Sequence, residues 1–266
     1  YIDWAPFFQT WDLHGRYPAI LEDEVVGESA KSLFKDAKKM LDKIINEKKL
    51  KANGVVGFYP ANSVNDDDIE LYADDESSDP IFTYYGLRQQ TQKPSIKGIK
   101  KPNISLADYI SPKESGIKDY IGLFAVTSGI NVEIYEKIYE KSEDDYNGIM
   151  IKAITDRLAE AFAEYMHDRV RKDLWGYQSK DLSNEEMIDE KYEGIRPAPG
   201  YPACPEHTVK KSIFKLLETN EIGMKLTESM AMIPASSVSG FYFAHPESSY
   251  FSVDKIDEDQ IKDMAE

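Results

Sequence analysis

The sequence predicts an α+β fold, a single curved domain in which helices flank a twisted, mainly antiparallel sheet. Two observations support this class. Some β-prone runs follow one another closely, as in an antiparallel sheet, whereas others are separated by long helical patterns. No repeat, low-complexity segment or flexible linker divides the chain, so we expect one domain over residues 1–266.

The first half of the chain contains one clear helix and four β-prone runs. Apolar residues recur at helical spacing from Leu33 to Ile45, and we expect this helix to end at the "KANG" segment that contains Gly54. The first three runs are "GVVGFYPA" from Gly54, "DDIELYAD" from Asp67 and "IFTYYG" from Ile81. The fourth, "DYIGLFAVTSG" from Asp119, is apolar almost throughout, which is typical of a strand inside a sheet.

The second half begins with the longest helical pattern, over about residues 146–175. Its apolar stripe consists of Ile151, Ile154, Leu158, Ala161 and Tyr165. Ser183 and Glu186 have the spacing of a capping box at the start of a short helix, and Thr208 is a candidate N-cap for "VKKSIFKLLE". The runs "VSGFYFAHP" and "SYFSVDKI" predict a hairpin, and a short acidic helix closes the chain.

Composition limits the function classes. The chain has 48 acidic and 32 basic residues, a formal charge of −16, and its Lys and Arg residues are scattered among acids, which argues against nucleic acid as a partner. No apolar run reaches about 18 residues, so we expect no membrane span. A single cysteine and the lack of signal-peptide features near the start favour a cytoplasmic protein.

Several familiar catalytic and binding motifs are missing from the sequence. It contains no G-x-G-x-x-G dinucleotide loop, no P-loop and no G-x-S-x-G nucleophile elbow. Cys204 and His207 have a spacing seen in metal sites, but zinc needs three or four ligands and no second Cys/His pair follows. We therefore interpret them as a buried thiol and a histidine at a helix start, and expect no metal site.

The segment "RPAPGYPACPEHT", residues 196–208, is the most unusual part of the chain. Its four prolines fix φ and keep it out of helices and central strands, and Gly200 allows a ligand to approach the backbone. Carbonyls outnumber N–H donors in such a loop, which suits the amino group of a purine, while the planar fork of Arg196 suits a carboxylate. A rigid surface connection with Arg196 in a routine salt bridge is the alternative.

The same segment resembles the R-x-x-x-G-Y motif, with its continuation, of the reactivation domain of cobalamin-dependent methionine synthase. The resemblance covers essentially the whole chain, in order. It extends to "IDWAPFFQTWDLHGRYPAILEDEVVGESAKSLFKDA", "DYIGLFAVTSG", "DRLAEAFAEYMHDRVRKDLWGY", "LSNEE", "GMKLTES" and "SVSGFYFAHPESSYF". The family fold is a curved α+β domain with a twisted antiparallel sheet, which agrees with the pattern above.

The resemblance implies a function. The family's domain binds S-adenosylmethionine, and the parent enzyme passes a methyl group from methyltetrahydrofolate through cobalamin to homocysteine. Oxidised cob(II)alamin is restored with an electron from flavodoxin or a similar reductase and a methyl group from S-adenosylmethionine. Cobalamin is held by another module, which is the expected partner. The start at "YIDW" fits a domain lacking part of its N-terminal segment, so we expect no complete turnover by this chain alone.

The resemblance also implies ligand-binding residues. Arg196 is expected to pair with the methionyl carboxylate, with the backbone of Ala198 and Gly200 against the ligand and Tyr201 close to the sulfonium. Asp3 is expected near the ligand's ammonium group, although an acid in an ordinary N-terminal turn is the alternative. No residue is expected to act as a catalytic acid or base, because a sulfonium is already an activated methyl donor.

Four further acidic or aromatic positions have an alternative interpretation. Tyr250 and Phe251 match an aromatic pair of the family, in which a second tyrosine often stands at the Phe251 position; strand core is the alternative. Glu160 lies on the polar side of its helix by pattern, whereas the family places this acid near the sulfonium. Glu190 and the helix predicted in "LSNEEMIDEKYEGI" either face the cobalamin module or belong to an ordinary capped surface helix, which the pattern favours.

Two other functions stay open from the sequence. One is a standalone activation protein that acts on a separate cobalamin enzyme. The other is a docking module for an electron donor, which would lack affinity for S-adenosylmethionine. Because an acidic chain repels acidic flavodoxin, docking would need a local basic face, for which Arg169 and Arg171 in "HDRVRK" are the candidates.

Overall fold

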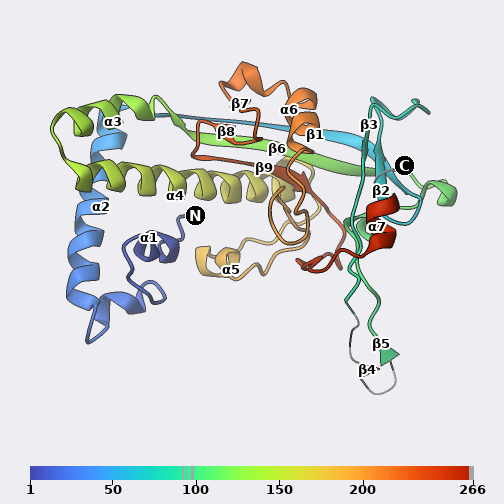
Figure 1. Ribbon diagram of the computed structural model, residues 1–266, viewed down its shortest axis with the longest axis horizontal. Helices are drawn as coiled ribbons and strands as arrows, with labels where there is room; N and C mark the ends of the chain where they lie inside the picture. The colour runs from blue at the N-terminus through green and yellow to red at the C-terminus, as the bar shows by residue number, and fades with distance from the viewer. Residues whose placement is uncertain (92, 94, 97–98, 264–266) are drawn as a thin grey trace.

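The computed structural model describes residues 1–91, 93, 95–96 and 99–263, and the main sheet runs through the length of the molecule (Figure 1). The strand order in this sheet is β3-β2-β1-β6-β9, and every neighbouring pair is antiparallel. Its strands are β1 (Lys51–Val64), β2 (Asp68–Leu71), β3 (Phe82–Tyr84), β6 (Asp119–Ile130) and β9 (Ser237–Tyr242). The predicted α+β class with a mainly antiparallel sheet is confirmed.

The α-helices are α1 (Ala5–Gln9), α2 (Gly27–Glu47), α3 (Val132–Lys141), α4 (Asp145–Arg169), α5 (Asn184–Ile188), α6 (Lys210–Leu216) and α7 (Glu258–Asp263). Of these helices, the sequence predicted α2, α4, α5, α6 and α7 in whole or in part. A π-helical turn, Val170–Leu174, continues α4 almost to the predicted end of the long helix. Helices α1 and α3 were not predicted, and neither were the two small hairpins β4 (Ser95–Ile96) with β5 (Ile99–Lys100) and β7 (Lys225–Leu226) with β8 (Met232–Ile233).

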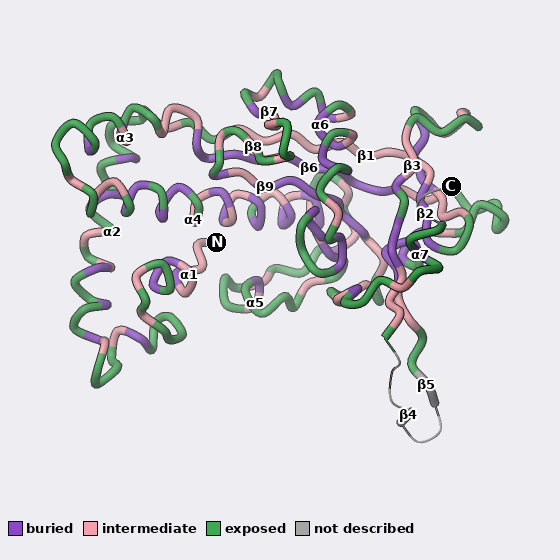
Figure 2. Tube along the Cα trace, viewed as in Figure 1, coloured by how far each residue is buried: buried purple, intermediate pink, exposed green. Residues whose placement is uncertain are grey.

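Strand β6 is an interior strand, as its apolar sequence predicted. Its side chains alternate between two cores: Leu123 and Ala125 pack with α6, whereas Phe124 and Val126 pack with α4. Figure 2 shows continuous burial along β6 and β9 and along much of α4. The sheet is therefore covered on both faces, by α4 on one side and by α6 on the other.

Helix α4 packs on more than one side, which the single predicted stripe missed. Ile151 and Ile154 contact the N-terminal helices, whereas Ala159 and Ala163 face the sheet. Tyr165, predicted to belong to the buried stripe, is exposed. The prediction was wrong because the part of α4 beyond residue 158 leaves the helical cluster and lies across the sheet.

Two predicted helix boundaries are corrected by the structure. Helix α2 ends at Lys48, which has φ +52°, and not at Gly54. Gly54 lies inside β1, where a Cβ would lie 3.0 Å from Phe162 Cζ, so the glycine makes room for α4. Thr208 does not cap α6; the carboxylate of Glu206 accepts hydrogen bonds from the backbone N–H groups of Thr208 and Val209. The capping box of Ser183 and Glu186 is confirmed.

The predicted last hairpin is wrong, because "SYFSVDKI" is not a strand. Residues 244–257, which we call the C-terminal strap, cross the proline-rich loop without a sheet partner. The strap is held by single contacts: Val253 N donates to Pro202 O at 2.9 Å, and the side-chain nitrogen of Gln89 donates to Ser252 O at 2.7 Å. The predicted acidic helix follows the strap as α7.

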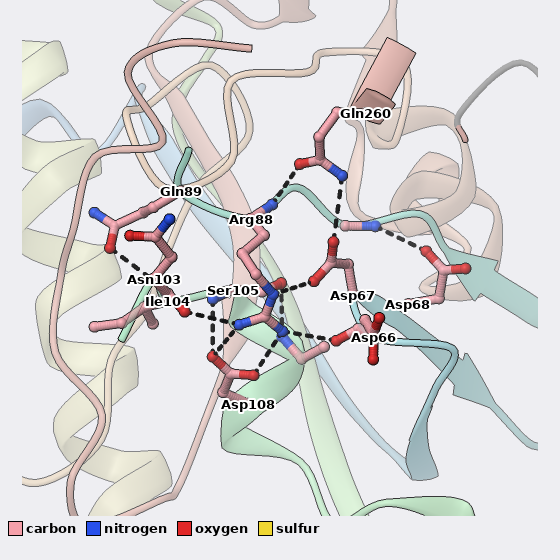
Figure 3. Close-up of polar contacts among 12 residues, drawn as sticks. Asp66, Asp67, Asp68, Arg88, Gln89, Asn103, Ile104, Ser105, Asp108 and Gln260 are labelled. Atoms are coloured by element: carbon pink, nitrogen blue, oxygen red, sulfur yellow. Dashed lines mark hydrogen bonds and ion pairs between the residues drawn. The ribbon is translucent and has the colours of Figure 1, made fainter. Parts of the chain in front are cut away.

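The C-terminal helix is fixed by a polar cluster around Arg88 (Figure 3). The Gln260 side chain of α7 accepts from Arg88 N at 2.7 Å and donates to Asp67 Oδ2 at 3.2 Å. Arg88 in turn binds Asp67 and Asp108. We call Arg88, Asp67, Asp108 and Gln260 the Arg88 anchor, which connects the end of the strap to the edge of the sheet.

Candidate functional site

A cleft of about 470 Å³ opens between the proline-rich loop, α4 and the C-terminal strap. The residues that line it include Glu160 of α4, Glu190, five loop residues (Arg196, Pro197, Ala198, Tyr201 and Pro202), and Tyr250 and Phe251 of the strap. A smaller cavity of about 200 Å³ adjoins it and is lined by Tyr1, Asp3, Arg157, Glu164 and Tyr192, among others. Arg196, Glu160 and Glu190 line both spaces, so the two form one continuous site.

The proline-rich loop is positioned by the edge strand β9. Ile195 and Phe243 exchange backbone hydrogen bonds of 3.0 Å, and Phe241 N donates to Pro197 O at 3.0 Å. A side chain on Gly240 would lie 2.4 Å from Pro197 O, so this glycine allows the loop to lie against the sheet. The loop is thus an edge addition, which its prolines permit and a central strand would not.

Gly200 shapes the turn that follows. It has φ +99°, a conformation that favours glycine, and its N–H donates to Cys204 O at 2.8 Å. A Cβ here would overlap the ring of His207. Burial raises the pKa of the Cys204 thiol to about 11, and its sulfur accepts a hydrogen bond from Tyr84.

Arg196 lies at the centre of the site, with only 20% of its side chain exposed. Its Nη2 donates to Glu164 Oε2 at 3.2 Å, and its backbone N–H donates to the hydroxyl of Tyr250 at 3.0 Å. Burial opposes the positive charge, but Glu164 and nearby tyrosines outweigh it and raise the pKa of Arg196. The Nε atom is buried and has no hydrogen-bond partner among the described residues.

A second arginine lies behind Arg196. Arg171 is 1% exposed, its Nη1 lies 3.6 Å from Glu164 Oε1, and its Nη2 lies 3.3 Å from Asp168 Oδ1. Its guanidinium also lies over the ring of Tyr192, 4.3 Å from the centroid. The hypothesis that Arg171 belongs to an exposed basic face is therefore wrong; only Arg169 of that pair is on the surface, where it binds Asp173. Arg171 lies inward because it continues the helix face of Glu164 and Asp168, whose carboxylates it contacts.

Arg196 is the cationic residue that lines the large cleft, Arg157 also lines the adjoining cavity, and several acids surround both spaces. Glu160 and Glu190 lie on the large cleft, and Asp3 lies on the small cavity, where its Oδ1 also accepts from Ala5 N at 3.0 Å. The negative charge of Glu160, followed by burial, raises the pKa of Tyr201. Such a site suits a zwitterion, with a carboxylate at the arginine and an ammonium or sulfonium at the acids, while proline and aromatic walls suit a planar ring.

The structure brings most of the predicted site residues together. Arg196, Ala198, Tyr201, Tyr250, Phe251 and Glu160 line the large cleft, and Asp3 lines the adjoining cavity. Gly200 shapes the loop from outside both linings, with His207 filling its open side. Glu160 is half-buried at the cleft although pattern alone directed it to solvent, because the loop and strap cover that side of α4.

Sequence reasoning missed the buried partners of Arg196. Glu164 and Arg171 stand seven residues apart, two helical turns, so a shared face of α4 was the available signal. Tyr192 was equally hidden, because it lies in the irregular segment between α5 and the loop.

Across residues 1–91, 93, 95–96 and 99–263, no helix combines the length and apolar character needed to span a membrane.

Comparisons with known proteins match essentially the whole chain. The family model described as vitamin B12 dependent methionine synthase, activation domain, matches residues 1–266. A solved structure, the MetH reactivation domain bound to AdoHcy, shares 57% sequence identity with the chain and superposes with a TM-score of 0.92. That match covers 99% of this chain and 80% of the solved one.

Proposed function

The chain belongs to the activation-domain family of vitamin B12 dependent methionine synthase, and we propose that it binds S-adenosylmethionine in the cleft beside Arg196. The observation that carries the proposal is a mostly buried guanidinium that makes one side-chain hydrogen bond among the described residues and faces acids across a cleft of about 470 Å³. AdoHcy, bound by the 57% identical MetH domain, is S-adenosylmethionine without the transferred methyl group, which supports the same ligand class here.

Each end of the ligand has a suitable partner. Arg196 would bind the carboxylate, and the acids Asp3, Glu160 and Glu190 would stabilise the ammonium and sulfonium charges. The loop backbone at Ala198 would contact the ligand directly in the large cleft, and Gly200, outside both linings, would meet it only where the turn borders that cleft. Tyr250 and Phe251 would form the opposite wall, and Phe251 can offer no hydroxyl contact there.

The cleft would present the methyl group rather than activate it. Tyr201 is 59% exposed at the cleft, so we propose that the methyl acceptor approaches on this side. Cobalamin, held by another module of the parent enzyme, would supply a reduced cobalt centre as the nucleophile. The residues of this chain need only hold the sulfonium in line and exclude alternative poses.

The full role would be reductive methylation of cob(II)alamin, which returns methionine synthase to methionine biosynthesis. One electron would come from flavodoxin or a similar reductase in the cytoplasm, and the methyl group from S-adenosylmethionine. The chain alone would bind its ligand without completing a turnover, because neither cobalamin nor the electron donor belongs to it.

The test is isothermal titration of the chain with S-adenosylmethionine and with AdoHcy, comparing wild type with Arg196→Ala. We expect binding by the wild type and a loss of about 100-fold in the variant, since a charged, mostly desolvated pair is removed. Arg169→Ala, which removes an exposed arginine of α4, is the matched control and should bind like the wild type.

A folded wild type that binds neither ligand would contradict the proposal and favour the docking-module alternative. Unchanged binding by Arg196→Ala would support the ligand class but would show that another residue binds the ligand carboxylate. Whether the chain acts within a larger enzyme or as a standalone activation protein is decided by adding it to a separate cobalamin module and measuring restored methyl transfer.

A further inference from the structure

We infer that Glu164 is a positioning residue, which holds the guanidinium of Arg196 in the orientation that receives the ligand carboxylate. The inference rests on the proposed function and adds a residue that neither contacts the proposed ligand groups nor was indicated by sequence. Glu164 lines the small cavity behind Arg196 and is not among the residues that line the large cleft.

Little else fixes the end of the Arg196 side chain. Its only side-chain hydrogen bond within the described residues is the 3.2 Å contact from Nη2 to Glu164 Oε2. An arginine side chain has several rotatable bonds, and a two-pronged contact with a carboxylate needs the planar fork in one orientation. Removing Glu164 would therefore leave the fork to be ordered by the ligand, at a cost to affinity.

Glu164 is itself held from the other side. Arg171 lies 3.6 Å from its second oxygen, and Asp168 and the ring of Tyr192 fix Arg171 in turn. The acid thus divides its charge between two arginines. Arg196 is oriented without being fully neutralised, and it keeps positive charge for an anion.

This arrangement separates the two ends of the ligand. Glu164 acts through Arg196, and Arg196 serves only the carboxylate in the proposed binding mode. The acids and aromatic residues that would serve the other groups lie on α4, the N-terminal segment, the turn after α5 and the strap. Loss of Glu164 should weaken ligands that carry the carboxylate and leave ligands without it unchanged.

The experiment measures the affinity of wild type and Glu164→Gln for AdoHcy and for decarboxylated AdoHcy, which keeps the adenosyl, thioether and amine groups. Glutamine preserves size and one acceptor oxygen but removes the charge. We expect about a tenfold loss for AdoHcy and no change for the decarboxylated compound. Asp173→Asn, which removes an exposed α4-end ion pair, is the matched control and should alter neither affinity.

A second variant, Glu164→Asp, guards against misfolding. It keeps a carboxylate beside Arg171 but ends one methylene group short of Arg196, so it should lose AdoHcy affinity as Glu164→Gln does. Three outcomes would overturn the inference: unchanged or increased AdoHcy affinity in Glu164→Gln, an equal loss for both ligands, or normal AdoHcy binding by Glu164→Asp. If wild type binds AdoHcy and Arg196→Ala does not, these outcomes reject only the positioning role of Glu164, and the proposed function is unaffected.

Discussion

Arg88 and Arg196 are both mostly buried arginines among acids, but they use their hydrogen-bond donors differently. Arg88 makes five side-chain hydrogen bonds, to both oxygens of Asp108, to Asp67 and to the carbonyls of Asp66 and Asn103 (Figure 3). A guanidinium has five N–H donors, so Arg88 is saturated. Within the part of the chain that the structure describes, Arg196 makes one such bond, to Glu164.

On the proposed function, the difference separates a structural arginine, Arg88, from a ligand-binding one, Arg196. The hollow beside Arg88 is the larger of the two, about 740 Å³ against 470 Å³, and its lining is rich in acids. Volume would therefore select the wrong site. Buried polar groups are normally satisfied, so a guanidinium with unused donors beside a cleft indicates that an acceptor arrives from outside the chain. The following predictions test this contrast.

The largest expected effect is on stability at Arg88. Arg88→Ala removes five hydrogen bonds and leaves the carboxylates of Asp67 and Asp108 without their cation. We expect the free energy of unfolding to fall by about 3 kcal/mol. Urea denaturation measures it, with Arg169→Ala as the exposed control, expected to change stability by less than about 0.5 kcal/mol. A loss no larger than that of the control would mean that Arg88 is not structural.

The second prediction concerns the pH dependence of stability, which we attribute to buried His167 near Arg196. His167 is fully buried; burial, with the charges of Arg171 and Arg196, holds its pKa well below the usual value. Below about pH 6.5 the unfolded chain takes up a proton that the folded chain refuses, so stability falls as pH decreases, by up to about 1.4 kcal/mol per pH unit.

Urea denaturation at pH 7.5, 6.5 and 5.5 checks this for wild type and His167→Gln. The variant should lose part of the pH dependence, whereas the same change at exposed His14 should keep it. Identical pH profiles for wild type and His167→Gln would show that the acid sensitivity has another origin.

The smallest expected effect tests whether the Arg88 anchor and the cleft beside Arg196 are coupled. Gln260→Ala removes both hydrogen bonds of α7 to the Arg88 anchor. We expect a loss of about 1 kcal/mol in stability, and a two- to threefold weaker binding of AdoHcy because Tyr250 and Phe251 belong to the strap that this anchor holds. Titration of the variant measures the affinity. Unchanged affinity would mean that the two regions are independent.

Periodicity and turn residues predicted most of the main sheet and the long helix, because these elements bury regular apolar patterns. The failures lie where tertiary contacts override local signals. Gly54 signals a break in sequence but serves a close approach of α4, and "SYFSVDKI" has strand composition but no neighbouring strand to pair with.

The sequence predicted the residues that line the candidate site, but not the buried charged residues behind Arg196. The proline-rich loop suggested Arg196 as a carboxylate ligand on chemical grounds, and the family resemblance supplied the acids and aromatic residues. Glu164 and Arg171 had only their seven-residue spacing as a signal, and that spacing does not indicate burial because charged residues in a helix usually face solvent. Their burial follows from the loop and strap that cover this end of α4, which is information that sequence periodicity does not contain.

The C-terminal strap has a kinetic consequence. One wall of the cleft is attached through single contacts, such as Val253 N to Pro202 O and Arg196 N to the Tyr250 hydroxyl, instead of a strand ladder. Lifting that wall breaks a few hydrogen bonds and leaves the five-stranded sheet intact. If the cleft binds the proposed ligand, entry and departure can proceed by local opening. The residence time of that ligand would then be a property of the strap, adjustable without changing the residues proposed to hold the charged groups.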